Sequence, residues 1–222
     1  MSDEYDCITQ KGDEPAFAGS DSNIPSIVVG LSTIIPRWTT STTIKWFIRA
    51  DKFPSDEEAA IAASAFDEAS NEWNAVNFGV TVYQTNDKKE ANFNLVYRDN
   101  PPNRPTVLAR AFFPHQEDRD VVVFKYGMDA KNRYRLKNVF LHELGHVFGL
   151  RHEFAIVKEG RGAKRFMNEN KLSVMAYNKI PTVQESDREE IRAFYQLENG
   201  ADVDGSPVTD YVPQLRSSNQ SG

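Results

Sequence analysis

The fold and the chemistry of this chain are decided by one stretch of sequence, His142-Glu143-Leu144-Gly145-His146-Val147-Phe148-Gly149-Leu150-Arg151-His152. Three of the four histidines in the 222 residues lie in it. Residues four apart share one face of a helix, so His142 and His146 can direct two imidazoles at a single ion. Glu143 lies one step round the helix from His142, where its carboxylate can reach a metal-bound water. The spacing therefore predicts a helical metal site.

The third histidine of this stretch completes the expected ligand set. His152 lies six residues after His146, out of reach of the same ion if the helix simply continues. Gly149 can adopt the left-handed conformation that ends a helix and turns the chain back. Three neutral imidazoles with one open position are typical of a catalytic zinc site, whereas a structural site closes with a fourth protein ligand. We therefore predict one catalytic Zn²⁺ bound by His142, His146 and His152.

A second motif downstream supports a family resemblance. The stretch Ser173-Val174-Met175-Ala176-Tyr177, taken with the histidine spacing, resembles the zinc-binding pattern and Met-turn of the metzincin peptidases. The resemblance implies that Met175 packs beneath the histidines without binding zinc. Tyr177 matches a tyrosine of the astacin and serralysin branches, which binds zinc in the resting enzyme and then hydrogen-bonds the reacting carbonyl. Glu153 is an astacin feature. The chain thus resembles a compact, fungal-type zincin between these two branches.

The resemblance also implies the fold class. A metzincin domain is α+β and two-lobed, with a twisted five-stranded mixed sheet, an active-site helix and a C-terminal helix. In this sequence, apolar patterning and the family resemblance together predict strands at 42–49, 78–83, 91–97, 106–114 and 121–126. Capping boxes predict helices that begin at Ser55 and Ser186. We expect the active-site helix to begin between Lys131 and Arg135.

The strand at 106–114 is also a candidate for the substrate cleft. It resembles the edge strand that binds substrate in matrixin and serralysin domains, and its central residues are Leu108, Ala109, Arg110 and Ala111. An extended peptide would add to such an edge through backbone hydrogen bonds, so the side chains need not be special. An ordinary strand is the alternative. His115, in the loop that follows, is expected to be solvated.

Composition divides the chain into three parts. Residues 1–25 mix acidic residues with Gly, Ser and Pro and predict a flexible N-terminal segment. We expect the catalytic domain at 26–198 and a disordered tail at 199–222. The first part can also be interpreted as a latency prosegment. In that case Cys7 would bind zinc as the matrixin prosegment cysteine does, although the matrixin motif around it is absent. Alternatively, Asp21 would bind zinc as the prosegment aspartate of astacins does.

Charge and cysteine content exclude several classes of protein. A formal net charge of −6 without a basic tract argues against general binding to nucleic acid or membrane surfaces. No run approaches the roughly 20 apolar residues that span a bilayer. A single cysteine excludes an intramolecular disulfide, and the acidic start of the chain lacks the apolar core of a signal peptide. We expect a monomer, and the localisation stays open between a cytoplasmic protein and a secreted one whose leader is missing or non-classical.

These observations predict a zinc-dependent endopeptidase acting on protein or peptide substrates. In this reaction zinc activates a water and polarises the scissile carbonyl. Glu143 would transfer a proton from that water to the leaving amine, and Tyr177 would donate a hydrogen bond to the oxyanion. The alternatives are a catalytically weak zinc-dependent peptide-binding protein and a zinc amidohydrolase of a non-protein amide. Calcium is conceivable, but no motif in the sequence supports it.

Overall fold

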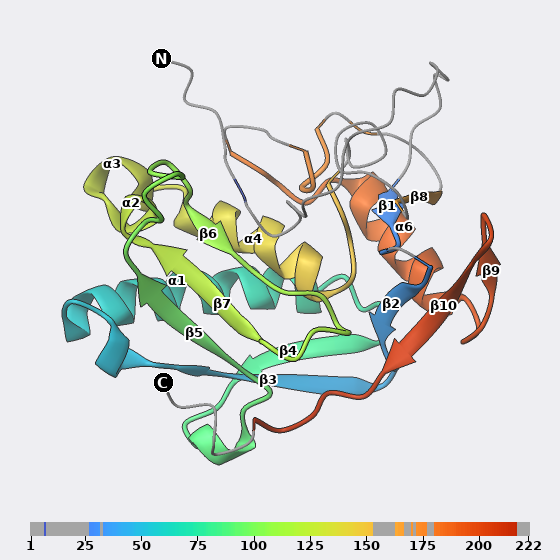
Figure 1. The fold of residues 1–222 in the computed structure, drawn as a ribbon, viewed down its shortest axis with the longest axis horizontal. Helices are drawn as coiled ribbons and strands as arrows, with labels where there is room; N and C mark the ends of the chain where they lie inside the picture. The colour runs from blue at the N-terminus through green and yellow to red at the C-terminus, as the bar shows by residue number, and fades with distance from the viewer. Residues whose placement is uncertain are drawn as a thin grey trace.

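The computed structural model describes Cys7 and residues 27–31, 33–152, 163–166, 170, 172–176 and 180–216. Its largest element is a five-stranded sheet in the order β4-β3-β5-β7-β6 (Figure 1). The strands are β3 (Thr42–Ile48), β4 (Val80–Gln84), β5 (Phe93–Arg98), β6 (Ala109–Arg110) and β7 (Asp120–Phe124). The first four strands in this order, β4, β3, β5 and β7, are parallel to one another. Strand β6 lies at one edge of the sheet and pairs antiparallel with β7. The predicted α+β fold with a mixed five-stranded sheet is confirmed.

Two long helices, α1 (Asp56–Asn74) and α4 (Leu136–Val147), cover one face of this sheet (Figure 1). As predicted, Ser55 caps α1, because its hydroxyl accepts the backbone N–H of Glu58 at 3.2 Å. Between helices and sheet the Phe66 ring meets Trp46, Phe93 and Phe140 edge to face, with centroids 4.8 to 6.0 Å apart. The active-site helix therefore lies directly on the main apolar core. Short helical turns join these elements: η1 (Ala50–Lys52), η2 (Lys88–Glu90), α2 (Lys125–Met128) and α3 (Ala130–Arg133).

A second group of elements forms the smaller lobe. Strand β1 (Ile27–Val29) pairs antiparallel with β8 (Lys164–Phe166), and both lie near α6 (Glu185–Gln196) (Figure 1). Helix α6 is capped by Gln184 rather than by the predicted Ser186. The reason is that the Asp187 carboxylate accepts the N–H of Gln184 at 2.7 Å, while the Ser186 hydroxyl pairs with the side chain of Asn170.

The prediction of a disordered tail from residue 199 is wrong for the residues up to 216. Strand β10 (Ser206–Tyr211) pairs parallel with β2 (Ile35–Trp38) and antiparallel with β9 (Asp202–Val203). Beyond β10, the N–H of Arg216 donates to the Ala91 carbonyl at 3.0 Å, and its guanidinium pairs with Asp120. This segment is held by backbone pairing and an ion pair. Because neither requires a periodic apolar pattern in the sequence, the sequence did not reveal it. No helix within the described ranges is long and apolar enough to cross a membrane.

Candidate metal centre

Helix α4 is fixed by hydrogen bonds from two buried tryptophans. The indole N–H of Trp73, from α1, donates to the Leu141 carbonyl at 2.9 Å. The indole N–H of Trp38, from β2, donates to the Val147 carbonyl at 2.7 Å. The second bond satisfies one of the carbonyls that the end of a helix leaves without an intrahelical partner. Because these donors come from different parts of the chain, they set the position of the helix that carries the first two histidines.

The turn that follows α4 depends on Gly149. This residue has a φ of +95°, and a side chain there would collide with the backbone oxygen of Pro36. The hydroxyl of Tyr195 donates to the Phe148 carbonyl at 3.0 Å, and burial raises the pKa of that hydroxyl, which therefore remains a donor. The chain consequently leaves the helix at the predicted glycine and returns with His152 toward the first two histidines.

The three predicted histidine ligands lie together and are fully buried. The Nε2 atom of His152 is 3.1 Å from that of His142 and 3.2 Å from that of His146. For tetrahedral zinc with Zn–N bonds of about 2.0–2.1 Å, the nitrogen atoms would stand about 3.3 Å apart. The spacing of the donors in this structure therefore fits a zinc ion.

The other ring nitrogens fix the tautomers of two of these histidines. The Nδ1 atom of His142 lies 2.8 Å from the carbonyl oxygen of Val174, and that of His146 lies 2.7 Å from the oxygen of Leu150. A protonated Nδ1 donates to each carbonyl, so the lone pair that can bind a metal is on Nε2. Burial, and next the charge of His152, lower the pKa of both rings well below the usual value. Both rings are therefore neutral near pH 7, as metal binding requires.

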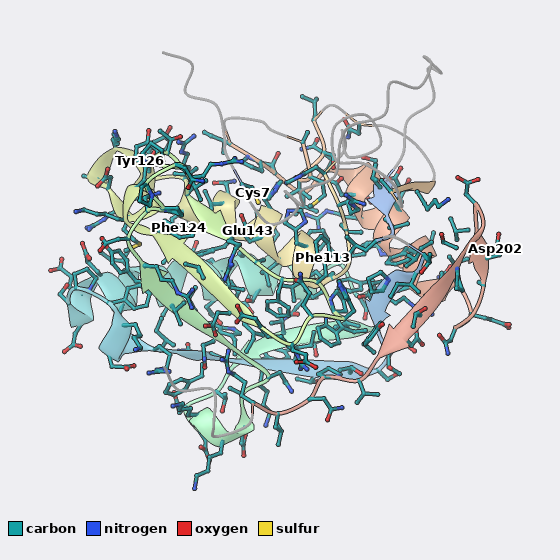
Figure 2. The ribbon with its side chains drawn as sticks, in the orientation of Figure 1. Cys7, Phe113, Phe124, Tyr126, Glu143 and Asp202 are labelled. Carbon is teal, nitrogen blue, oxygen red and sulfur yellow. The ribbon has the colours of Figure 1, made fainter. Side chains whose placement is uncertain are left out.

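Cys7 joins this cluster from the N-terminal end of the chain. Its buried Sγ is 3.7 Å from Nε2 of His146, and the four potential ligand atoms all lie within 4.8 Å of one another. Tetrahedral zinc with one sulfur ligand at about 2.3 Å would place sulfur and nitrogen about 3.6 Å apart. Cys7 also forms a parallel bridge with Ala109. Figure 2 labels Cys7 and, on α4, Glu143. Of the two prosegment residues considered, Asp21 lies outside the described residues.

Glu143 is fully buried next to His142 on α4, and its role in proton transfer stays a prediction. Tyr177 and Glu153 lie outside the described part of the chain. Within the described ranges, the histidine and cysteine cluster is the only group of three or more His, Cys, Asp or Glu side chains arranged to hold a metal ion. No calcium site is supported there.

The Met-turn packs directly against the active-site helix. Met175 is 1% exposed, and a Cβ atom added at Gly145 would collide with its sulfur. Gly145 is one residue before His146, so the sulfur lies against the part of the helix between the first two histidines. The arrangement agrees with the packing role that the sequence motif predicts for Met175.

Asp187 holds the Met-turn in place, a role that sequence reasoning missed. Its buried carboxylate accepts the Ser173 hydroxyl at 2.6 Å and the Val174 N–H at 2.9 Å, in addition to the N–H of Gln184. Burial raises its pKa. Since the Val174 N–H donates to Asp187 and the Val174 carbonyl pairs with His142, Asp187 supports a metal-ligand candidate through a single residue. The predicted capping box started at Ser186 and gave Asp187 no role, so only the fold shows its contact with the Met-turn.

The candidate cleft residues occupy the edge of the main sheet. Leu108, Ala109 and Ala111 are buried, and Leu108 and Ala109 pack in one apolar cluster with Cys7. Arg110 is partly exposed and forms an ion pair with Asp118 at 3.6 Å. The structure therefore places the cleft candidates beside the metal-binding cluster.

His115 is half-buried, so the prediction of a solvated loop residue is wrong. Its ring stacks on Phe113 at 6.3 Å and meets Tyr211 at 6.4 Å. Burial lowers its pKa. Phe113 in turn lies edge to face with the ring of His146 at 5.5 Å. Tyr211, which packs against the His115 ring, comes from β10, a strand that sequence analysis did not predict.

The fold and the cluster define a class of protein, the metzincin-type zinc peptidases. Residues 37–196 match the family model of the matrixins, and the chain belongs to this family. Membership implies a zinc metallopeptidase that acts on proteins or peptides. No curated protein matches the sequence. The matching family is not one of the two branches suggested by Tyr177, and the placement between astacins and serralysins is not confirmed.

A methyl group added at Gly145 tests the packing of the Met-turn. We expect Gly145→Ala to carry the usual cost of overpacking a core, about 1–3 kcal/mol, and to lower the free energy of unfolding by a net amount of up to about 2 kcal/mol. This cost opposes the roughly 1 kcal/mol by which alanine normally stabilises a helix. Urea unfolding of the metal-free protein measures the change. The matched control is the double variant Gly145→Ala with Met175→Ala, in which Gly145→Ala should cost less than in the parent. A Gly145→Ala protein more stable than its parent by the full helix gain of about 1 kcal/mol would contradict the packing described here.

Proposed function

We propose that the protein is a zinc-dependent endopeptidase that hydrolyses internal bonds of proteins or peptides. The observation that carries this proposal is the convergence of the Nε2 atoms of His142, His146 and His152 at a spacing that fits zinc. Membership of the matrixin family supports the same conclusion independently.

The roles of the individual residues follow from this assignment. A bound zinc ion would supply the Lewis acid that activates water and polarises the scissile carbonyl. Glu143 accepts the proton of the attacking water and passes it to the leaving amine nitrogen. Its burial keeps the carboxylate in a low-dielectric site, where its interactions with the reactants are strong. Tyr177 is proposed to bind the resting ion and to donate a hydrogen bond to the oxyanion, as its place in the Met-turn motif suggests.

Cys7 is proposed to keep the full chain latent. Its thiolate would take the fourth ligand position, which a catalytic zinc site needs open for water. The same residue pairs with Ala109, in the strand proposed to bind substrate at Leu108 to Ala111. Cys7 therefore blocks both the open position of the metal and the edge where a peptide would pair.

We propose that the catalytic domain begins near residue 26 and extends past 198 to include β10. This strand pairs with β2, and the ion pair between Arg37 and Asp210 at 2.7 Å joins the two. Arg37 also donates to the carbonyls of Phe194 and Leu197 at the end of α6. Residues after 198 therefore contribute to the packing of the smaller lobe.

The decisive experiment is zinc stoichiometry measured together with peptide-library cleavage, on a Cys7→Ser protein so that latency does not interfere. We expect one zinc per chain, and cleavage at internal bonds that stops on chelation and returns when Zn²⁺ is added. Zinc binding without cleavage would favour a peptide-binding protein. Hydrolysis of small amides alone would favour an amidohydrolase. The buried Glu143 and the matrixin family favour neither alternative.

A further inference from the structure

Arg151 is a buried cation immediately before the third histidine. It is 3% exposed, and its guanidinium donates to the carbonyl of Gly30 at 2.9 Å. Its backbone N–H donates to the carbonyl of Val28 at 2.7 Å, where the two residues form an antiparallel bridge. One residue is thus attached to the same short segment through both its main chain and its side chain.

The segment that receives these bonds is itself firmly placed. On its other side, β1 pairs with β8 in the register Val28 to Arg165. The side chains of Val28 and Val29 are 1% and 0% exposed. Figure 1 shows β1 between β8 and the start of β2, beside α6. Of the two carbonyls that Arg151 contacts, that of Val28 belongs to this packed strand and that of Gly30 to the residue directly after it.

Of the three histidines, His152 most needs an external support. His142 and His146 are held by α4, whereas His152 follows the left-handed turn at Gly149. After this turn, the backbone bond from Arg151 to Val28 fixes the chain one residue before His152. A shift of this bond would move the ring of His152 relative to the other two.

The positive charge of Arg151 does not itself favour a metal site at the neighbouring histidines. The pKa of His146 is lowered mainly by burial and next by the charges of His152 and His142. The charge of Arg151 lowers it more weakly. A positive charge at this distance opposes binding of a cation. The contribution of Arg151 to a metal site must therefore come from its contacts.

We propose that Arg151 and residues 27–30 act as a positioning device for His152. The inference rests on the proposed zinc-peptidase function and adds to it a limit on processing. Any cleavage that removes Cys7 must leave Ile27 and the following residues on the enzyme, because they hold the third ligand. The N-terminal part of the chain thus carries both the inhibitory residue and a support of the active site.

The test compares Arg151→Met and Arg151→Lys in the Cys7→Ser protein. Contacts that orient metal ligands are worth about 10–100-fold in metal affinity, so we expect Arg151→Met to bind zinc weaker by that factor. Arg151→Lys should be intermediate, because its ammonium can still donate to the Gly30 carbonyl. Competition with a chromophoric chelator gives the affinity, and the visible spectrum of the Co²⁺-substituted protein reports the ligand geometry. If Arg151→Met fails to fold, Arg151→Lys decides the outcome.

Arg37→Met is the matched control. Arg37 is equally buried and donates to the Phe194 and Leu197 carbonyls at 2.6 Å, so its loss should lower thermal stability and leave zinc affinity unchanged. Zinc affinity in Arg151→Met that equals or exceeds the parent value, or falls no further than in Arg37→Met, would overturn the inference alone. A parent protein that binds no zinc would overturn the proposed function as well.

Discussion

Replacement of Cys7 by serine in the full chain is expected to raise the rate of peptide cleavage by about 100-fold or more. The estimate assumes that the thiolate occupies the open ligand position in at least about 99 of 100 molecules, so that removing it frees the site in nearly all of them. A serine hydroxyl is a far weaker zinc ligand than a thiolate. Because Cys7 is buried 3.7 Å from Nε2 of His146, the effect should arise within the site itself.

A variant that retains a ligand at position 7 provides the control. Cys7→His can still bind the metal and should remain far less active than Cys7→Ser. Initial rates on a quenched fluorescent peptide, at equal zinc content, compare the three proteins. Equal rates for the unmodified chain and Cys7→Ser would show that the contact does not inhibit the enzyme.

Glu143→Ala in the Cys7→Ser protein should lower turnover by about 10²–10⁴-fold, the range expected when a general acid–base group is removed. Glu143 is fully buried on α4 and is not one of the four candidate ligands, so zinc content should be unchanged. Single-turnover cleavage and zinc analysis measure the two properties on the same sample.

Glu143→Gln separates proton transfer from packing. Glutamine keeps the size of the buried side chain but cannot accept the proton of the attacking water, so it should be nearly as inactive as alanine. The thermal stability of the glutamine variant should stay closer to that of the parent. A glutamine variant with normal turnover would remove Glu143 from the mechanism and leave zinc binding unaffected.

Local patterns were sufficient to predict much of the fold and part of the site. Ser55 caps α1 as predicted, because the signal consists of residues three apart. Gly149 ends the active-site helix with a positive φ, because few other residues tolerate that conformation. The spacing of His142 and His146 follows from the helical repeat alone. In each case the determinant lies within a few residues in sequence.

The remaining features depend on contacts between distant residues. Strand β10 pairs with β2, and Arg151 pairs with β1, across more than a hundred residues in each case. Backbone pairing of this kind requires no particular side chains and therefore leaves little trace in the sequence. Cys7 was likewise one of two candidate prosegment ligands in a segment predicted to be flexible, and only the fold places it beside the histidines. Asp187 had no role in the predicted capping box, and its contact with the Met-turn joins residues that are fourteen apart.

The bridge between Cys7 and Ala109 also bears on how the molecule behaves at high concentration. Strand β6 lies at the edge of the main sheet, and an open strand edge offers its backbone groups to any neighbouring chain. Cys7 already occupies part of this edge, at Ala109. The contact proposed to prevent premature cleavage thus also hinders edge-to-edge aggregation, so that an inactive stored form would be more soluble than the activated enzyme.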